Sequence, residues 1–427
     1  MLRTIQSAIF TDTDYLTPSQ IQQKILKIAK YFQWQGINET SLCLIRLHDP
    51  LDQILALFAL LLLKSKVALI NPRLPELLTK ELLKDLGPYV SVDHFEEALE
   101  PYDNITFDTQ LPLILLASSG SQGTPKWIVS KIDNWLKSAE GTILHLNAKP
   151  HEPWILNLPL FHVSGLAIVF RAFFISAPLV ITKHDLFLPN SRISLVSKQI
   201  ETLEKSGQLE RLLKSESILI GGGKLDTHTF KKVKHLPIYI SYGMTEACSS
   251  ISLSEKSPNE IQEGKVLKYR TLELSETNQI FIGGEAACDY IWKKGSLVFL
   301  KNNKGLIATS DHGMICSSMI HIQGRLDERI EINGEKIFPF QIENELKAHF
   351  SFSSLIVTHI IDENLKTHIV AFCHPIPDDK TLNEMKHSIG SLFFPKYFLP
   401  LEESSGSEKI RLIDLKEKAF MALRNVQ

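Results

Sequence analysis

One short segment, LASSGSQGTPKWIV at residues 116–129, follows an apolar run and combines hydroxyl side chains, two glycines and a lysine. In such a loop, backbone N–H groups and hydroxyls can surround an anion, and glycines allow a ligand to approach the backbone closely. Lys126 adds a positive charge, so the segment predicts a phosphate-binding loop. It does not match the mononucleotide P-loop GxxxxGK[ST], because Pro125 precedes the lysine and Trp127 follows it. A plain surface loop between two elements is the alternative.

Two further segments place candidate residues directly after predicted strands. In NLPLFHVSGLA, residues 157–167, Phe161 and His162 lie in a loop, where the histidine either acts on a ligand or makes a structural hydrogen bond. In SILIGGGKL, a strand ends on Gly221, Gly222 and Gly223. Three glycines either form a turn or leave a flat backbone surface on which a planar ring can lie.

Two more segments carry carboxylates. ISYGMTEACS contains Thr245 and Glu246 at the end of a strand, where a carboxylate can bind Mg²⁺, or where Glu246 caps a helix. ATSDHGMI places Asp311 at a predicted boundary between strand and loop. There the carboxylate can accept hydrogen bonds from two ribose hydroxyls, or simply form a turn.

Composition excludes several classes of protein. The chain has 427 residues, 44% of them hydrophobic and 22% charged, which predicts a globular protein with at least two domains. A net charge of −2 gives no argument for binding nucleic acid or an anionic membrane. The most apolar stretch, ILALFALLLL, ends at Lys64, well short of the ~20 residues of a spanning helix, so it predicts a core helix.

Cysteine usage bears on the compartment. The five cysteines form no CxxC pair, and their odd number favours free buried thiols in a reducing compartment. The N-terminal segment MLRTIQSAIFTDTDYL lacks the apolar core of a signal peptide. We therefore expect a cytoplasmic protein.

The elements that would position these residues alternate along the chain. LDQILALFALLLLKS predicts a helix, and KVALINP, LPLILLAS, WILNLPL, APLVIT, ESILIGGG and LPIYISYG predict strands. This alternation predicts an α/β fold of layered sheets and helices, with ligand loops at the carboxyl ends of parallel strands.

The pattern changes after about Leu272, where short strands and tight turns follow, including a hairpin turn at KNNKG. A last α+β portion combines helices at PFQIENELKAHF and TLNEMKHSIGSLF with strands at SLIVTHII and HIVAFCH.

In this order, the segments SSGSQGTPK, LPLFHVSG, GGG, YGMTE, TSDHG and GRLDERIEINGEKIFPFQIE resemble the adenylate-forming enzymes, which include acyl- and aryl-CoA synthetases, adenylation domains and luciferases. NPRLPELLTKELL, NLPLFHVSGLAIVFRAFF and GSEKIRLIDLKE look most like the o-succinylbenzoate–CoA ligases of menaquinone biosynthesis. The resemblance implies a large N-terminal adenylate-forming domain over residues 1–326, with a β-rich part at 272–326. It also implies a small mobile α+β C-terminal domain over residues 327–427.

The implied reaction has two steps and uses ATP, Mg²⁺ and CoA. A carboxylate attacks the α-phosphorus of ATP to give acyl-AMP and pyrophosphate, and the thiol of CoA then displaces AMP. An anion must approach a polyanion in the first step, so positive and dipolar groups must offset both charges. The implied partners are a small carboxylic acid and CoA, without nucleic acid or membrane, and homodimers are frequent in the family.

Residue roles follow from the motif positions. The implied ATP-binding residues are Ser118, Ser119, Gly120, Ser121, Gly123 and Lys126 at the β- and γ-phosphates, Gly221, Gly222, Gly223 and Tyr242 with Gly243 at the adenine, Thr245 at the α-phosphate, and Asp311 and Arg325 at the ribose. Glu246 is implied as the Mg²⁺ ligand, Asp327 as the hinge, and Lys409 as the adenylation lysine that reaches both the carboxylate and the α-phosphate.

Substrate choice is implied by a smaller set of residues. His162, which with Thr245 and Lys409 completes the catalytic set, would lie at the acyl and CoA entry, where Ser164 and Gly165 shape the pocket. Arg171 is placed among apolar and aromatic residues, where a charged group is costly unless it is paired or reaches a pocket. In the subfamily an arginine at this position is a candidate for the second carboxylate of o-succinylbenzoate. A structural salt bridge to an Asp or Glu is an equal alternative.

Three other functions remain open at this point. The enzyme could activate another aryl or acyl acid, or it could transfer acyl-AMP to the thiol of a carrier protein. Gln122 replaces a hydroxyl residue of the phosphate loop, and this departure supports the third alternative, a nucleotide-binding protein without catalytic activity.

Overall fold

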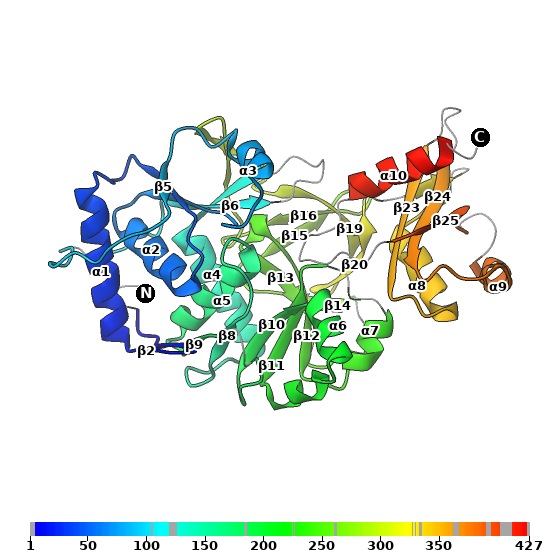
Figure 1. Ribbon diagram of the computed structural model, residues 1–427, viewed down its shortest axis with the longest axis horizontal. Coiled ribbons are helices and arrows are strands. Elements are labelled where there is room, and N and C mark those ends of the chain that lie inside the picture. The colour runs from blue at the N-terminus through cyan, green and yellow to red at the C-terminus, as the bar shows by residue number, and fades with distance from the viewer. Residues whose placement is uncertain are drawn as a thin grey trace.

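The computed structural model describes residues 5–103, 106–118, 126–182, 186–223, 225, 227–259, 263–326, 328, 330–332, 335–361, 367–389, 394–401 and 412–424. Figure 1 shows a large body of sheets and helices and, at its right, a smaller one that holds α8 to α10 and β23 to β25. The α/β prediction is confirmed.

One sheet of seven strands forms the core of the first part of the chain. Its order is β18-β17-β7-β6-β4-β3-β5, with β3 at Leu42–Ile45, β4 at Lys66–Leu69, β5 at Val90–Val92, β6 at Pro112–Ser118, β7 at Lys126–Lys131, β17 at Tyr290–Lys293 and β18 at Ser296–Phe299. Strands β5, β3, β4 and β6 run parallel, and β7 returns antiparallel to β6. The predicted phosphate loop therefore joins two antiparallel strands.

The apolar stretch ILALFALLLL is a core helix, as predicted. It forms α2, Pro50–Leu62, in which every residue from Gln53 to Leu62 is buried. The helix begins at Asp49, whose carboxylate accepts hydrogen bonds from the N–H groups of Leu51 and Asp52. It packs against α1, Pro18–Trp34, and α3 follows at Glu76–Leu83. In the part of the chain that the structure describes, no helix is long and apolar enough to cross a membrane.

A second sheet has thirteen strands, and one half of it is largely parallel. This half contains β1 (Ile9–Thr11), β2 (Tyr15–Leu16), β8 (Trp154–Leu156), β9 (Leu179–Ile181), β10 (Arg192–Val196), β11 (Ser217–Gly221) and β12 (Ile238–Met244). On one face, side chains such as Ile193 and Ile218 pack with α6, Ser197–Lys205, and α7, Thr227–Val233, and η1 lies at Leu209–Lys214. The other side is covered by α4, Ile132–Leu146, and α5, Val163–Phe174.

The other half of this sheet is antiparallel. Its strands are β13 (Ser249–Leu253), β14 (Glu263–Val266), β15 (Thr271–Leu274), β16 (Gln279–Gly283), β19 (Ile307–Cys316) and β20 (Met319–Arg325), and the short 3-10 helix η2 (Thr245–Ala247) precedes β13. The change to short strands after about Leu272 is confirmed.

The hairpin predicted at KNNKG is wrong. A tight turn is present, because Asn302 Oδ1 accepts hydrogen bonds from the N–H groups of Lys304 and Leu306. The strands on its two sides lie in different sheets, however, since β18 pairs with β17 and β19 pairs with β16 and β20.

The smaller body has its own apolar core. It contains β21 (Ile330–Ile332), β22 (Glu335–Ile337), α8 (Pro339–His349), β23 (Ser354–Ile361), β24 (Thr367–His374), α9 (Asp379–Ile389), β25 (Tyr397–Pro400) and α10 (Leu412–Arg424). Alternate residues of β24 enter two cores, so that Ile369 packs with the side chains of α8 and Val370 with those of α10. The helices and strands predicted for this portion are confirmed.

All five cysteines are free thiols, and four of them are buried, as expected. Cys316, at the end of β19, is exposed, which corrects the expectation for that residue. Cys248 and Cys288, forty positions apart in the chain, bring their sulfur atoms to 3.6 Å.

Candidate active site

The ends of β6 and β7 bring the edges of the predicted phosphate loop together. Ser118 and Lys126 are opposite each other in the antiparallel pair, and both strands contact η2. The Ser118 hydroxyl is buried without a hydrogen-bond partner among the described residues. The residues between them, including the predicted Ser119, Gly120, Ser121 and Gly123, lie outside the described residues.

A hydrogen-bonded pair joins distant strands of the larger sheet. The Tyr242 hydroxyl, on β12, donates to Asp311 Oδ2, on β19, at 2.7 Å. Arg325, opposite Asp311 on β20, places Nη1 3.8 Å from Asp311 Oδ1. Three strands separate β12 from β19 in the sheet, so this contact shows that the sheet curls back on itself.

Asp311 lies within β19 and not at the end of a strand, so the expected boundary is corrected and the alternative of a turn is wrong. Burial and the neighbouring carboxylate raise the pKa of Tyr242 well above 10, so the phenol stays protonated and remains a donor.

Glu246 lies in η2, which contacts both strands at the loop edges. This half-buried residue directly follows β12, and the residue before η2, Met244, makes no side-chain hydrogen bond that caps it. Burial raises its pKa, while Lys126 and Arg325 act in the opposite direction and Asp311 adds to the increase. These four residues, which come from four different elements, are therefore within electrostatic reach of one another.

The donor set fits Mg²⁺. No cluster of three or more His, Cys, Asp or Glu side chains that could hold a metal ion is found among the described residues. Mg²⁺ commonly binds one or two carboxylates and completes its shell with phosphate oxygens and water. A single half-buried glutamate beside the predicted phosphate loop is an arrangement of that kind.

Two sets of glycines shape the backbone near Tyr242. Gly222, at the end of β11, has φ of +80°, which only glycine adopts easily. Gly243 lies at a bulge of β12, where a Cβ atom would come within 2.3 Å of the Ser249 carbonyl oxygen. Gly221 would contact Ser241 at an ordinary 3.5 Å, and nothing lies within 4 Å of the corresponding position at Gly223. The three glycines thus end β11 in a bend, where Gly223 alone of the three has open space at its Cβ position.

The segment around His162 leads into α5. His162 is exposed at the residue before the helix, with its ring centroid 4.8 Å from that of Phe161. Ser164 is half-buried in the first turn. A Cβ atom at Gly165 would come within 2.1 Å of the Pro159 carbonyl oxygen, so this glycine permits the helix to lie against the preceding loop.

Arg171 is buried in α5 and has no acidic partner among the described residues, so the alternative of a structural salt bridge finds no support in that part of the chain. Its Nη2 lies 3.1 Å from both Ser249 Oγ and Ser250 Oγ, and its guanidinium lies 5.8 Å from the ring of Trp154. Nε has no hydrogen-bond partner among these residues. Burial and the charge of Arg270 lower the pKa of Arg171 to about 9.

Several polar residues near Arg171 were not found from the sequence. Ser249 and Ser250 directly follow the YGMTEAC segment, and Arg270 approaches from a loop. Asn157 Oδ1 and Ser194 Oγ are buried without partners among the described residues. Ser194 lies on the same face as Trp154, because β8 and β10 pair with Trp154 opposite Arg192. A serine within a buried strand, such as Ser194 in β10, has no sequence signal that separates it from an ordinary core position.

Two further predicted residues, the adenylation lysine Lys409 and the hinge residue Asp327, also lie outside the described residues.

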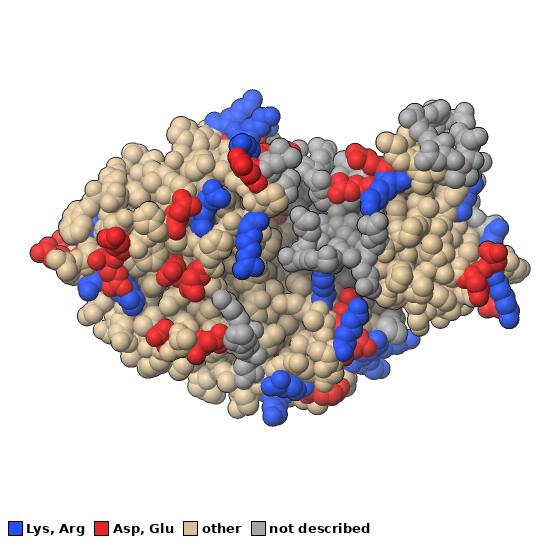
Figure 2. All heavy atoms as spheres, in the orientation of Figure 1, with Lys and Arg blue, Asp and Glu red and all other residues tan. Residues whose placement is uncertain are grey.

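On the face drawn in Figure 2, the described basic and acidic side chains are interspersed and form no patch of one sign.

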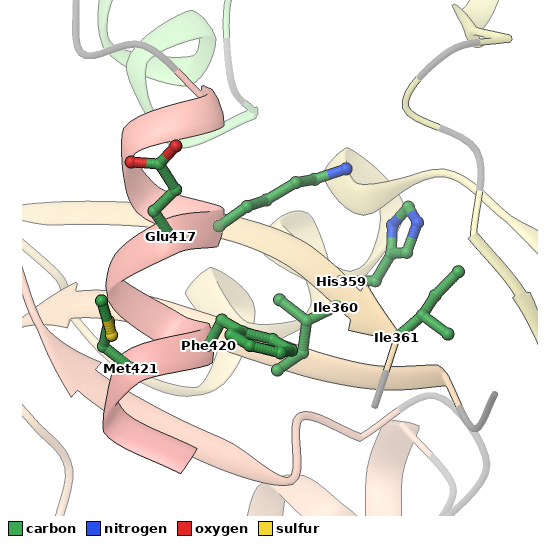
Figure 3. A pocket seen from close by; sticks show the side chains of 7 residues that line it. His359, Ile360, Ile361, Glu417, Phe420 and Met421 are labelled. Carbon is green, nitrogen blue, oxygen red and sulfur yellow. The ribbon is translucent and has the colours of Figure 1, made fainter. Parts of the chain in front are cut away.

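A cavity of about 470 Å³ lies elsewhere, between β23 and α10 of the smaller body. Figure 3 shows its lining, which is mainly apolar and includes Ile360, Phe420 and Met421. Burial and the charge of Lys416 lower the pKa of His359, on its wall, to about 4. None of the predicted site residues lines this cavity, so it is not the candidate site.

Comparisons with known proteins agree with the geometry. A family model described as AMP-binding enzyme matches residues 93–271. A 2-succinylbenzoate–CoA ligase of Haemophilus influenzae is 30% identical over 368 residues, which cover 81% of this chain and 78% of that protein. The 2-succinylbenzoate–CoA ligase of Escherichia coli is 26% identical over 432 residues, covering 96% of this chain and 94% of that protein.

Solved structures share the fold. A variant of E. coli MenE with bound OSB-AMS has a TM-score of 0.83 at 24% identity and covers 98% of this chain and 96% of that chain. The o-succinylbenzoate CoA synthetase of Bacillus subtilis in complex with ATP and magnesium ion has a TM-score of 0.79 at 20% identity, with 93% of each chain covered. The chain therefore belongs to the AMP-binding, adenylate-forming enzymes, in the family of the 2-succinylbenzoate–CoA ligases.

Proposed function

We propose that the protein is an ATP-dependent ligase that joins o-succinylbenzoate to CoA through an acyl-AMP intermediate. The observation that carries the choice of acid is Arg171, a buried guanidinium without an acidic partner among the described residues. o-Succinylbenzoate has two carboxylates: the succinyl carboxylate is activated, and the ring carboxylate stays free to bind this cation.

Charge explains the first step. A carboxylate must approach the triphosphate, and Lys126 and Arg325 provide positive charge near Glu246. We assign Ser118, Ser119, Gly120, Ser121, Gly123 and Lys126 to the β- and γ-phosphates, Thr245 to the α-phosphate, and Asp311 with Arg325 to the ribose. Mg²⁺, held by Glu246, would offset phosphate charge. The glycine backbone at Gly221 to Gly223 and the ring of Tyr242 would hold the adenine.

The second step needs the two domains to change their orientation relative to each other. We propose that residues 1–326 and 327–427 are the two domains, with the hinge at Asp327. Lys409 would reach the attacking carboxylate and the α-phosphate in the first step and leave in the second, when the thiol of CoA enters past His162, Ser164 and Gly165. A mobile ammonium suits this role because it can neutralise two anions at once.

Selection among acids follows from the cost of an unpaired buried charge. Leaving a buried ionic group without its partner costs about 3–5 kcal/mol. An acid with the ring carboxylate removes that cost and one without it does not. We therefore expect a preference of roughly 100-fold or more in kcat/KM for the acid with two carboxylates.

The test is pyrophosphate release with ATP and Mg²⁺, measured with o-succinylbenzoate, benzoate or octanoate, with and without CoA. We expect release and thioester formation with o-succinylbenzoate alone, loss of both in Lys409→Ala, and a raised KM for the acid in Arg171→Ala. Turnover of another acid in place of o-succinylbenzoate would refute the choice of substrate. Activity with a carrier protein but not with CoA would refute the choice of thiol.

A cytoplasmic location and a homodimer are further proposals. The odd number of cysteines and the absence of a CxxC pair support a reducing compartment. The dimer rests on analogy with the family, and sedimentation velocity would test it.

A further inference from the structure

Two arginines from distant parts of the chain meet around one serine. Arg171 Nη2 lies 3.1 Å from Ser250 Oγ. Arg270 binds the same residue from the other side, since its Nε and Nη2 donate to the Ser250 carbonyl oxygen at 3.1 and 2.9 Å. Arg270 Nη2 also donates to Ser138 Oγ, on α4, at 2.9 Å. Neither arginine has an acidic partner among the described residues.

The segment that Arg270 holds has an unfavourable backbone. Cys248 and Ser249 have φ of +48° and +99°, a region that residues with a side chain adopt at a cost. Ser138 Oγ donates to the Cys248 carbonyl oxygen at 2.6 Å, and Arg270 binds both Ser138 and the Ser250 carbonyl. Arg270 is therefore one of the groups that keep this segment in place, and the same segment supplies the two hydroxyls bound by Arg171.

Charge gives Arg270 a second effect. The guanidinium groups of Arg171 and Arg270 repel each other within a partly buried region, and burial lowers the pKa of Arg270 to about 10. Each keeps one buried nitrogen without a hydrogen-bond partner among the described residues, Nε of Arg171 and Nη1 of Arg270. A single bound anion would relieve the repulsion, whereas a neutral group in its place would leave it.

We propose that Arg270 is a positioning residue for the acid pocket, which orients Arg171 through the Cys248–Ser250 segment and strengthens binding of the free carboxylate of the substrate. This inference rests on the proposed function in one respect, namely that the acid carries a second carboxylate. It does not require Arg270 to touch the substrate. The alternative is that Arg270 contributes only to folding.

Two conservative substitutions separate charge from positioning. Arg270→Lys keeps the charge but cannot donate two hydrogen bonds in the geometry of a guanidinium, and Arg270→Gln keeps hydrogen-bonding ability without the charge. Arg46→Gln, at a partly exposed arginine with a distant ion pair, is the matched control. Unfolding of each variant is followed in parallel, so that loss of folded protein is recognised.

The first readout uses two acids that share the succinyl chain. o-Succinylbenzoate carries the ring carboxylate, and 4-oxo-4-phenylbutanoate lacks it. In Arg270→Gln we expect the KM for o-succinylbenzoate to rise by roughly 10-fold or more, the KM values for ATP and 4-oxo-4-phenylbutanoate to change less than about twofold, and Arg270→Lys to be intermediate. Equal changes in all three KM values would overturn the proposal, because a purely structural role predicts them.

The second readout does not depend on turnover. Benzoate binding is measured by calorimetry in the wild type, Arg171→Met, Arg270→Gln and Arg46→Gln. We expect an affinity that is lost in Arg171→Met, falls by roughly 10-fold in Arg270→Gln and is kept in Arg46→Gln. If the affinity for benzoate does not fall in both Arg171→Met and Arg270→Gln, the inference is overturned. Failure of the wild type to turn over o-succinylbenzoate would instead refute the proposed function.

Discussion

The hydrogen bond between Tyr242 and Asp311 allows a quantitative prediction. Tyr242→Phe removes the hydroxyl that donates to Asp311 Oδ2 at 2.7 Å and keeps the ring. Asp311 is only 7% exposed, so water cannot readily replace the lost donor. Arg325 Nη1, at 3.8 Å from the other carboxylate oxygen, is too distant for a direct hydrogen bond.

The magnitude follows from the charge of the acceptor. A hydrogen bond to a charged group contributes about 1.5–3 kcal/mol, and we expect Tyr242→Phe to lower the free energy of unfolding by that amount. The same energy corresponds to a factor of roughly 10 to 150 in an equilibrium constant. If Asp311 binds the ribose, part of this factor appears as a raised KM for ATP, because the carboxylate is no longer held in one orientation.

Urea denaturation and initial rates provide the assay. Tyr239→Phe is the matched control, since Tyr239 lies on the same strand, is also half-buried, and makes no hydrogen bond through its hydroxyl among the described residues. A double-mutant cycle with Asp311→Asn isolates the pairwise energy. The reasoning is refuted if the two tyrosine variants lose equal stability, or if the cycle gives a coupling energy below about 0.5 kcal/mol.

Three further predictions concern the same region and the thiols. Burial raises the pKa of Glu246 and so disfavours its ionised form, and the folded state loses stability as the pH rises through that pKa. Glu246→Gln should therefore raise the melting temperature at neutral pH while it weakens Mg²⁺-dependent activity, and a lower melting temperature would contradict this. Gly243→Ala would place a Cβ atom 2.3 Å from the Ser249 carbonyl oxygen, which should cost about 1–3 kcal/mol of stability and raise the KM for the acid. Gly207→Ala, which also strains the backbone but meets open space, should leave that KM unchanged in the same assay. An aromatic disulfide reagent should label Cys316 rapidly and the other four cysteines only after unfolding, and labelling of two or more thiols in the native protein would show the burial to be wrong.

Much of the fold could be predicted from the sequence because its signals are local. The apolar helix α2 follows from a run rich in leucine and alanine after the capping residue Asp49, and the strands of the larger sheet follow from short apolar runs that end in small residues. The prediction at KNNKG failed for the opposite reason. A turn forms locally, but which strands pair on its two sides depends on partners far away in the chain, here β17 and β16.

Within the candidate site, the sequence motifs identified the functional residues but not the residues that surround them. The motif order indicated Lys126, Glu246, Asp311 and Arg325, and the structure brings these four within electrostatic reach. It also places Asp311 inside β19, and the curl of the sheet, which no local pattern records, lets Tyr242 reach it although three strands separate β12 from β19.

The sequence by itself determined the α/β layering, the order of the ligand loops and the family, because periodicity and motif spacing depend on residues close together in the chain. Only the tertiary structure decided what surrounds Arg171. Its hydroxyl partners lie 78 and 79 positions away, and the second arginine comes from a different loop. Whether a buried cation meets an acid, a serine or another cation is decided by the packing of helices against a curled sheet, and so the sequence left a salt bridge and an anion pocket as equal alternatives.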